Sequence, residues 1–152
     1  MTVAFLQNMW VKNPERVRAD IQRHGEGFRL RFMKYALFAG CVTGRRLKAA
    51  FGDLCDEIVW EETTREIAGD PKTIFPAQPD HIRAVLEKYK PDVVLTFGAI
   101  ARLVVLPLWS GRLIAAPHPA ARQPDTIAKL QAAAAELRKV KPDNDAGERR
   151  EN

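Results

Sequence analysis

Residues 113–122, Leu-Ile-Ala-Ala-Pro-His-Pro-Ala-Ala-Arg, carry the side chain best suited to chemistry, a histidine between two prolines. Each proline fixes its own φ angle and restricts the residue before it, so His118 has little backbone freedom. The apolar residues before it are typical of a strand, and open α/β sheets bind ligands at the carboxyl ends of their strands. A histidine held stiffly at that edge suits acid–base or hydrogen-bonding chemistry. The alternative is a rigid strand-exit turn with a surface histidine.

Two further strand ends carry polar or small residues. Asn8 follows the first apolar stretch of the chain, and Thr96-Phe97-Gly98 follows a strongly apolar one. In a parallel sheet these ends lie at one edge, so the amide of Asn8 and the imidazole of His118 are expected to face one pocket. Flat apolar walls for that pocket are available from four aromatic residues, Trp10, Phe38, Phe97 and Trp60.

The sequence lacks the residue patterns that several other chemistries need. Glu61 and Glu62 are adjacent, so in a strand they point to opposite faces and form no catalytic pair. The chain has no phosphate-binding loop, no dinucleotide-binding glycine motif and no serine nucleophile elbow. Its two cysteines and three histidines have no metal-ligand spacing, so we expect no metal and no cofactor. Cys41 precedes an expected helix start, which leaves a thiolate nucleophile as a lesser alternative to an inert thiol.

The elements that must position these residues alternate along the chain. Strands are expected at residues 3–7, 57–61, 92–97 and 113–116, and helices at about 14–22, 44–51, 80–89, 99–108 and 124–139. Residues 26–42 are aromatic and basic, and we expect them to be less regular. Strands that alternate with helices predict an α/β fold, a three-layer α/β/α arrangement around a central, mostly parallel four-stranded sheet.

Three helix starts carry recognisable caps. Asn13 followed by Pro14 predicts an N-cap and a first helical residue, and Thr43 and Asp80 are the caps expected for two later helices. Lys90-Pro91 is expected to end the last of these helices.

Composition sets the class of protein. The 152 residues are 46% hydrophobic and 28% charged, typical of one globular domain, expected at 1–138 before a charged, disordered tail at 139–152. No apolar run is long enough to cross a bilayer and no secretory signal begins the chain, so we expect a cytoplasmic monomer without a membrane partner. The net charge of +5, concentrated in residues 16–34, 45–48 and the tail, allows a polyanionic partner.

The order of four segments resembles the uracil-DNA glycosylase superfamily over about residues 2–135. These segments are the polar end of the first strand at Asn8, Leu-Phe-Ala-Gly followed by Thr-Gly at residues 37–44, Pro-Asp-Val-Val-Leu-Thr-Phe-Gly at 91–98, and Ala-Pro-His-Pro-Ala-Ala-Arg at 116–122. The first motif departs most, because the glycine and proline usual there are missing. Ala120 also replaces the usual serine. The two cysteines exclude the branch that holds an iron–sulfur cluster.

The resemblance implies a monofunctional DNA glycosylase that removes uracil or related deaminated bases, with DNA as its partner. His118 would donate to the departing base and Asn8 would position a water, with Gln7 and Asn13 as substitutes for Asn8. Phe38 matches the phenylalanine that stacks on the extruded base, a contact worth about 1–3 kcal/mol. Arg122 takes the place of the side chain wedged into the duplex.

The remaining expectations concern the base and the DNA rim. We expect Gln7, Thr96 and Gly98 beside the base, and Arg45 and Arg46 on DNA. The family often reads the base edge with an asparagine at a strand end, and neither Glu61 nor Thr96 is that residue. Two alternatives stay open: a non-catalytic module that binds damaged or single-stranded DNA, and a small α/β enzyme acting on a nucleotide-like anion.

Overall fold

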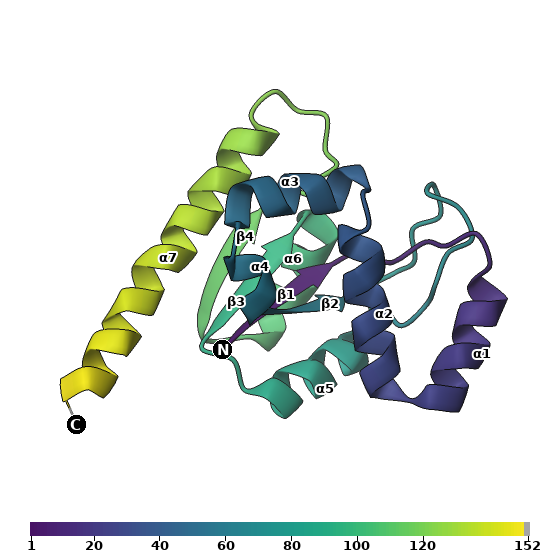
Figure 1. Ribbon diagram of the computed structural model, residues 1–152, viewed down its shortest axis with the longest axis horizontal. Helices are drawn as coiled ribbons and strands as arrows, with labels where there is room; N and C mark the ends of the chain where they lie inside the picture. Colours follow the sequence, from purple (N-terminus) through teal and green to yellow (C-terminus); the bar gives the residue numbers. More distant parts are fainter. Residues whose placement is uncertain (151–152) are drawn as a thin grey trace.

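A four-stranded parallel sheet lies at the centre of the protein (Figure 1). The computed structural model describes the backbone of residues 1–150 and the side chains of residues 1–140. The strands are β1 (Thr2–Leu6), β2 (Ile58–Glu62), β3 (Val93–Phe97) and β4 (Arg112–Ala116), in the order β2-β1-β3-β4. All three pairings in this sheet are parallel. The expected α/β class and its central sheet are confirmed, with strand ends shifted by one residue in several places.

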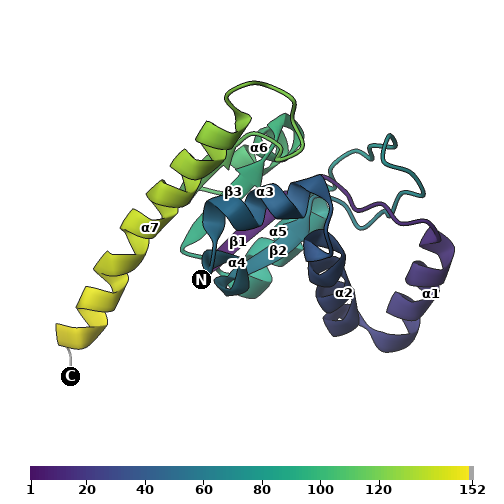
Figure 2. The same ribbon diagram turned by 45° about the horizontal axis from the view of Figure 1, so that its top comes forward.

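Helices cover both faces of the sheet. One face packs against α2 (Glu26–Phe38), α3 (Val42–Phe51), α4 (Leu54–Glu57) and α7 (Thr126–Arg150), and the other against α5 (Pro79–Tyr89) and α6 (Ala99–Val105). The alternation of β1 explains both cores, because Ala4 and Leu6 enter the first whereas Val3 and Phe5 enter the second. Figures 1 and 2 show α7 running beside β4 and α1 (Pro14–His24) at the opposite end of the molecule, beyond α2.

The start of α1 follows the sequence closely. Asn13 is its N-cap, with Oδ1 accepting a hydrogen bond from the Arg16 backbone N–H at 3.3 Å, and Pro14 is the first helical residue. The helix ends at Gly25, whose φ of 88° is in the region that favours glycine.

The expectation of irregular structure at residues 26–42 is wrong, because α2 occupies most of this stretch. The pattern misled because a charged residue sits on the inward face: Arg29 is buried beside Met33. At the same time Phe28 is only half-buried, and its ring lies against those of His24 and Phe32. With polar and apolar residues exchanged between the faces, the helical period is hidden.

Two expected caps are also wrong. The N-cap of α3 is Cys41, whose Sγ accepts from the Gly44 backbone N–H at 3.4 Å, so Thr43 lies one residue inside the helix. In α5, Asp80 lies in the first turn, while Gln78 holds the cap position without a side-chain bond to the helix backbone. The helix after Gly98 ends at Val105 and continues as a 3₁₀ turn, η1 (Leu106–Leu108), because Pro107 lacks a backbone N–H.

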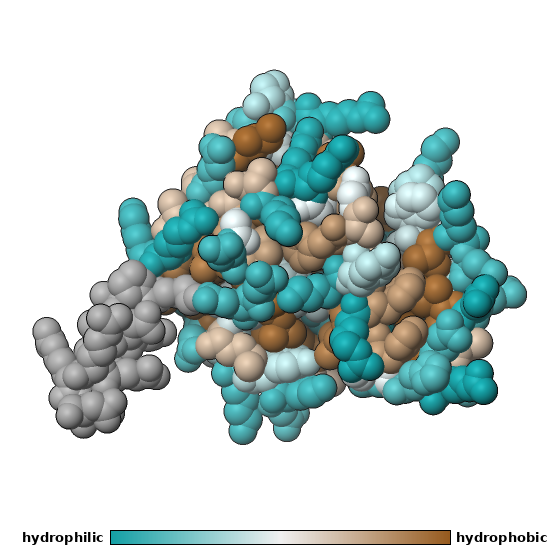
Figure 3. Space-filling view, in the orientation of Figure 1, coloured by the Kyte–Doolittle hydropathy of each residue, from teal (hydrophilic) through white to brown (hydrophobic). Residues whose placement is uncertain are grey.

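Two further features concern the surface and the tail. Figure 3 shows hydrophilic residues over most of one face, with an apolar area over α1 and α2. None of the helices in the described part of the chain is long and apolar enough to span a membrane. The last helix continues to Arg150, beyond the expected helix end at residue 139. Side chains are described only to residue 140, and the disorder expected for residues 139–152 stays a prediction.

Candidate functional site

A cavity of about 390 Å³ opens at the carboxyl ends of β1 and β2. Asn8 and Gln7 reach it from the end of β1, and His118 reaches it from the loop between β4 and α7. The structure therefore brings together the two residues expected to do chemistry, although they lie near opposite ends of the chain. The floor and one wall come from Leu6, Met33 and apolar residues of α2, so a largely apolar, concave site carries a few polar groups, as small-molecule sites do.

The surroundings of His118 determine which ring nitrogen carries its proton. Its Nδ1 accepts a hydrogen bond from the Ala120 backbone N–H at 3.1 Å. Burial lowers the pKa of His118, so its ring is neutral at neutral pH. A neutral imidazole whose Nδ1 is an acceptor carries its proton on Nε2, and His118 is therefore a hydrogen-bond donor without being a cation.

Arg46 holds the loop that carries His118. Its Nη1 donates to the carbonyl oxygens of Pro119 at 2.8 Å and Ala121 at 2.9 Å. Those bonds tie α3 to the histidine loop through one nitrogen, Nη1, of the guanidinium expected to contact DNA. Arg46 is half-buried, whereas Arg45 and Arg122 are exposed.

Gly98 packs against His118 and does not line the cavity. Its φ is 96°, its N–H donates to the Ala116 carbonyl at 2.9 Å, and a Cβ added to it would lie 3.3 Å from the His118 Cβ. The expected position beside the base is therefore not where the structure places it. Gly98 lines a separate surface hollow between α6 and α7.

We expect Gly98→Ala to lower the free energy of unfolding by about 1–3 kcal/mol, because alanine is strained at this φ. Urea denaturation measures the change. Gly69→Ala is the matched control, because its φ is not in the restricted region and its Cβ would meet only the Pro14 ring at 3.5 Å. Equal losses in both variants would contradict the assignment of strain to Gly98.

Asn8 uses both ends of its amide to hold a loop. Oδ1 accepts from the Phe75 backbone N–H at 3.0 Å, and Nδ2 donates to the Thr73 carbonyl at 3.2 Å. These bonds fasten residues 70–75 over the end of β1, so Asn8 shapes the rim of the cavity. Because an amide oxygen has two lone pairs, Oδ1 retains capacity for one more donor, such as a water.

Two of the residues expected beside the base lie elsewhere. Phe38 packs edge-on against Trp60 with ring centroids 5.5 Å apart, in the aromatic cluster under the sheet. Thr96 is fully buried in β3. An aromatic side chain that does line the cavity is Trp10, which is 48% exposed. The sequence predicts Trp10 only as one of four possible walls of the pocket.

A buried carboxyl group was missed as a site residue. Glu62 ends β2 and lines the cavity, yet it is 7% exposed. Burial, followed by the charge of Glu61, raises the pKa of Glu62 to about 8. The sequence does contain a signal for Glu62, because it is a polar residue at the end of a strand. The expected strand ends at residue 61, one residue too early, so Glu62 is not recognised as a strand-end residue.

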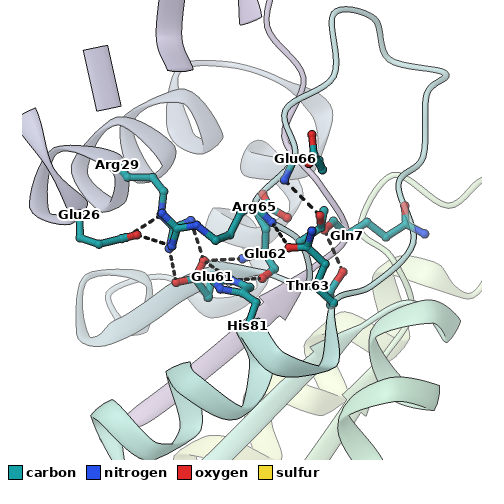
Figure 4. Close-up of polar contacts among 11 residues, drawn as sticks. Gln7, Glu26, Arg29, Glu61, Glu62, Thr63, Arg65, Glu66 and His81 are labelled. Atoms are coloured by element: carbon teal, nitrogen blue, oxygen red, sulfur yellow. Dashed lines mark hydrogen bonds and ion pairs between the residues drawn. The ribbon is translucent and has the colours of Figure 1, made fainter. Parts of the chain in front are cut away.

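Glu61 belongs instead to a buried ion pair with Arg29 (Figure 4). Arg29 donates to both of its oxygens, at 2.9 and 2.7 Å, and His81 Nε2 lies 3.4 Å from Oε1. Burial alone would raise the pKa of Glu61, but hydrogen bonds from His81 and Arg29 and the guanidinium charge lower it. Arg29 also donates to Glu26 at 2.7 Å. The network locks α2 against β2 and so fixes the wall that faces Asn8.

Comparison of the chain with protein-family models, with curated proteins and with solved structures found no match in any of the three. Within the described residues, no three His, Cys, Asp or Glu side chains come together as a metal site.

Proposed function

We propose that the protein is a monofunctional DNA glycosylase that removes uracil or related deaminated bases. The observation that carries the proposal is that Asn8 and His118, which follow the ends of β1 and β4, line one cavity. A glycosylase needs such a concave site because the base must leave the duplex before its bond to the sugar is cut. The resemblance in the order of four sequence motifs supports the same activity.

The proposed reaction needs no covalent nucleophile. The bond between C1′ and the ring nitrogen breaks, its electrons leave with the base, and the sugar develops positive charge. His118 Nε2–H donates to the oxygen on which the negative charge collects, and a preorganised donor there lowers the barrier. Water adds to C1′ and loses a proton to solvent, while the base anion takes up a proton after release.

Asn8 would hold that water through the second lone pair of Oδ1. An amide is not a base, so Asn8 orients the water without deprotonating it. We therefore expect slower turnover than an aspartate would give and a broader range of removed bases.

Arg45 and Arg122 are the exposed cations proposed to meet the DNA backbone, and salt dependence separates them from Arg46. We expect Arg45→Gln and Arg122→Gln each to reduce the slope of log affinity against log salt by about one. Arg46→Gln should leave that slope unchanged, because its guanidinium binds loop carbonyls. Fluorescence anisotropy with labelled DNA measures the three slopes. A reduced slope for Arg46→Gln would place that side chain on DNA.

The proposed function is tested by incubating excess protein with DNA that contains one uracil, hypoxanthine, xanthine or mismatched thymine, in single and double strands. Alkali then converts each base-free site into a strand break that a gel resolves. Breaks at the modified position are expected with at least one substrate. Intact DNA across the panel would refute glycosylase activity.

A second candidate is a module that binds damaged or single-stranded DNA without cutting it. The observation that favours it is that the Asn8 amide already bonds the backbone of Thr73 and Phe75. Such a module would show salt-dependent DNA binding with no base release. Its affinity for DNA would not depend on Asn8 holding a water.

A further inference from the structure

Glu62 lines the cavity but has no role in the proposed reaction. Its register partner in the sheet is Leu6, so it stands at the cavity floor beside the end of β1. Its Oε2 atom is buried and has no hydrogen-bond partner among the residues whose side chains are described. A buried polar atom without a partner is costly. Because the residue also lines the cavity, a molecule bound there is the candidate partner for this carboxyl group.

The neighbours of Glu62 decide its charge. Glu61 is adjacent and anionic, and the Arg29 guanidinium already donates to Glu61 and Glu26. His81 Nε2, from α5, contacts the Glu62 backbone carbonyl at 3.1 Å and not its carboxyl. Burial and Glu61 together hold the pKa of Glu62 at about 8, against the opposing effect of Arg29.

The opposite side of the cavity brings no cation to Glu62. The titratable groups there are Cys41, His118 and Asp70. His118 is neutral because burial lowers its pKa, and hydrogen bonds from Thr73 and Lys72 lower the pKa of Asp70, which is therefore anionic. At neutral pH Glu62 is a carboxylic acid with one O–H donor and one carbonyl acceptor side by side.

We infer that Glu62 recognises the edge of the bound ring by pairing with an N–H and a C=O on neighbouring ring atoms, as in uracil. The carboxyl O–H donates to the ring carbonyl, and the carboxyl C=O accepts from the ring N–H. The inference rests on the proposed function only in taking a nucleobase as the occupant of the cavity. Ionisation of Glu62 removes the O–H donor, and the resulting carboxylate oxygen repels the ring carbonyl oxygen.

Calorimetric titration with free uracil and with 1,3-dimethyluracil, from pH 6.5 to 9, tests this pairing. Above pH 8 the affinity of the wild-type protein for uracil should fall, approaching tenfold per pH unit. Glu62→Gln offers a donor and an acceptor that do not titrate, so it should retain affinity apart from ionisation of uracil itself, which affects both proteins equally. 1,3-Dimethyluracil lacks both ring N–H groups and should bind the wild type at least tenfold more weakly. Identical pH profiles, equal binding of 1,3-dimethyluracil, or no uracil binding to either protein would overturn the inference.

Stability provides a readout that needs no ligand. Between its unfolded pKa of 4.5 and its folded value of about 8, Glu62 holds a proton in the folded state only. Stability should therefore fall as pH rises, by up to tenfold in the folding constant per pH unit. The lowered pKa of His118 opposes this only below 6.5, its unfolded value, so pH 6.5–8 is the window to measure. Glu62→Gln should lose this slope, and a wild-type protein without the slope would overturn the inference.

Base release separates this inference from the proposed function. A protein that binds uracil with the expected pH dependence but releases no base from DNA supports the inference and refutes the glycosylase. A protein that releases base while both forms bind uracil with identical pH profiles supports the glycosylase and overturns the inference.

Discussion

We expect His118→Ala to lower the rate of base release by about 10²- to 10³-fold, the usual loss when one preorganised donor to a developing anion is removed. The proline-flanked loop and its bonds to Arg46 hold Nε2–H in place before the substrate arrives. Alanine leaves the charge on the departing base without that donor. Single-turnover kinetics on uracil-containing DNA measures the change, because enzyme excess removes product release from the rate.

Two controls sharpen this expectation. His24→Ala removes an exposed histidine at the end of α1, whose ring contacts that of Phe28 in α2, and should leave the rate unchanged. Arg46→Gln retains the imidazole but removes the bonds that fix its loop, so the rate should fall less than it does in His118→Ala. If His118→Ala released base as fast as His24→Ala, the imidazole would have no part in the reaction.

Arg29→Met should lower the free energy of unfolding by about 3–5 kcal/mol, which is the second large effect we expect. Methionine fills the space of Arg29 but leaves the Glu61 carboxylate buried without its cation, and unpaired buried charges are strongly destabilising. The lowered pKa of Glu61 stabilises the folded state above its unfolded value of 4.5, and this contribution is lost as pH falls through the folded pKa. In the variant that loss should begin at a higher pH. Urea denaturation from pH 4 to 7 measures both effects.

A double variant and a surface pair provide the comparison. Arg29→Met combined with Glu61→Leu removes both charges and should recover part of the lost stability. Arg83→Met breaks the exposed pair with Asp80 on α5 and should produce no measurable change. A loss in Arg29→Met as small as that in Arg83→Met would show that the buried pair does not hold α2 against the sheet.

Local patterns were enough to predict most of the fold. The apolar runs that became β1 and β3, and the Asn13-Pro14 start of α1, depend on neighbours in sequence, and they were found there. The helix α2 was not found, because the inward position of Arg29 is acceptable only with Glu61 placed against it from another element. No property of residues 26–38 alone reveals that partner.

The site was predictable only in part, for a related reason. The convergence of Asn8 and His118 follows from parallel topology, since strand ends share one edge. The exclusion of Phe38 from the cavity depends on Trp60, which takes that ring into the core. The raised pKa of Glu62 depends on Arg29 being bonded to Glu26 and Glu61, and these contacts between distant segments cannot be read from the sequence.

The position of β1 at the middle of the sheet has a consequence for how the chain assembles. Val3 pairs with Val59 on one side and with Val94 on the other, so neither ladder joins segments that are close in sequence. Such distant pairings slow folding, because a long stretch of chain must be ordered before the first contact forms. During synthesis, β1 leaves the ribosome before β2 and β3, and both of its edges stay unpaired until those strands follow. That interval is when the protein is most exposed to aggregation.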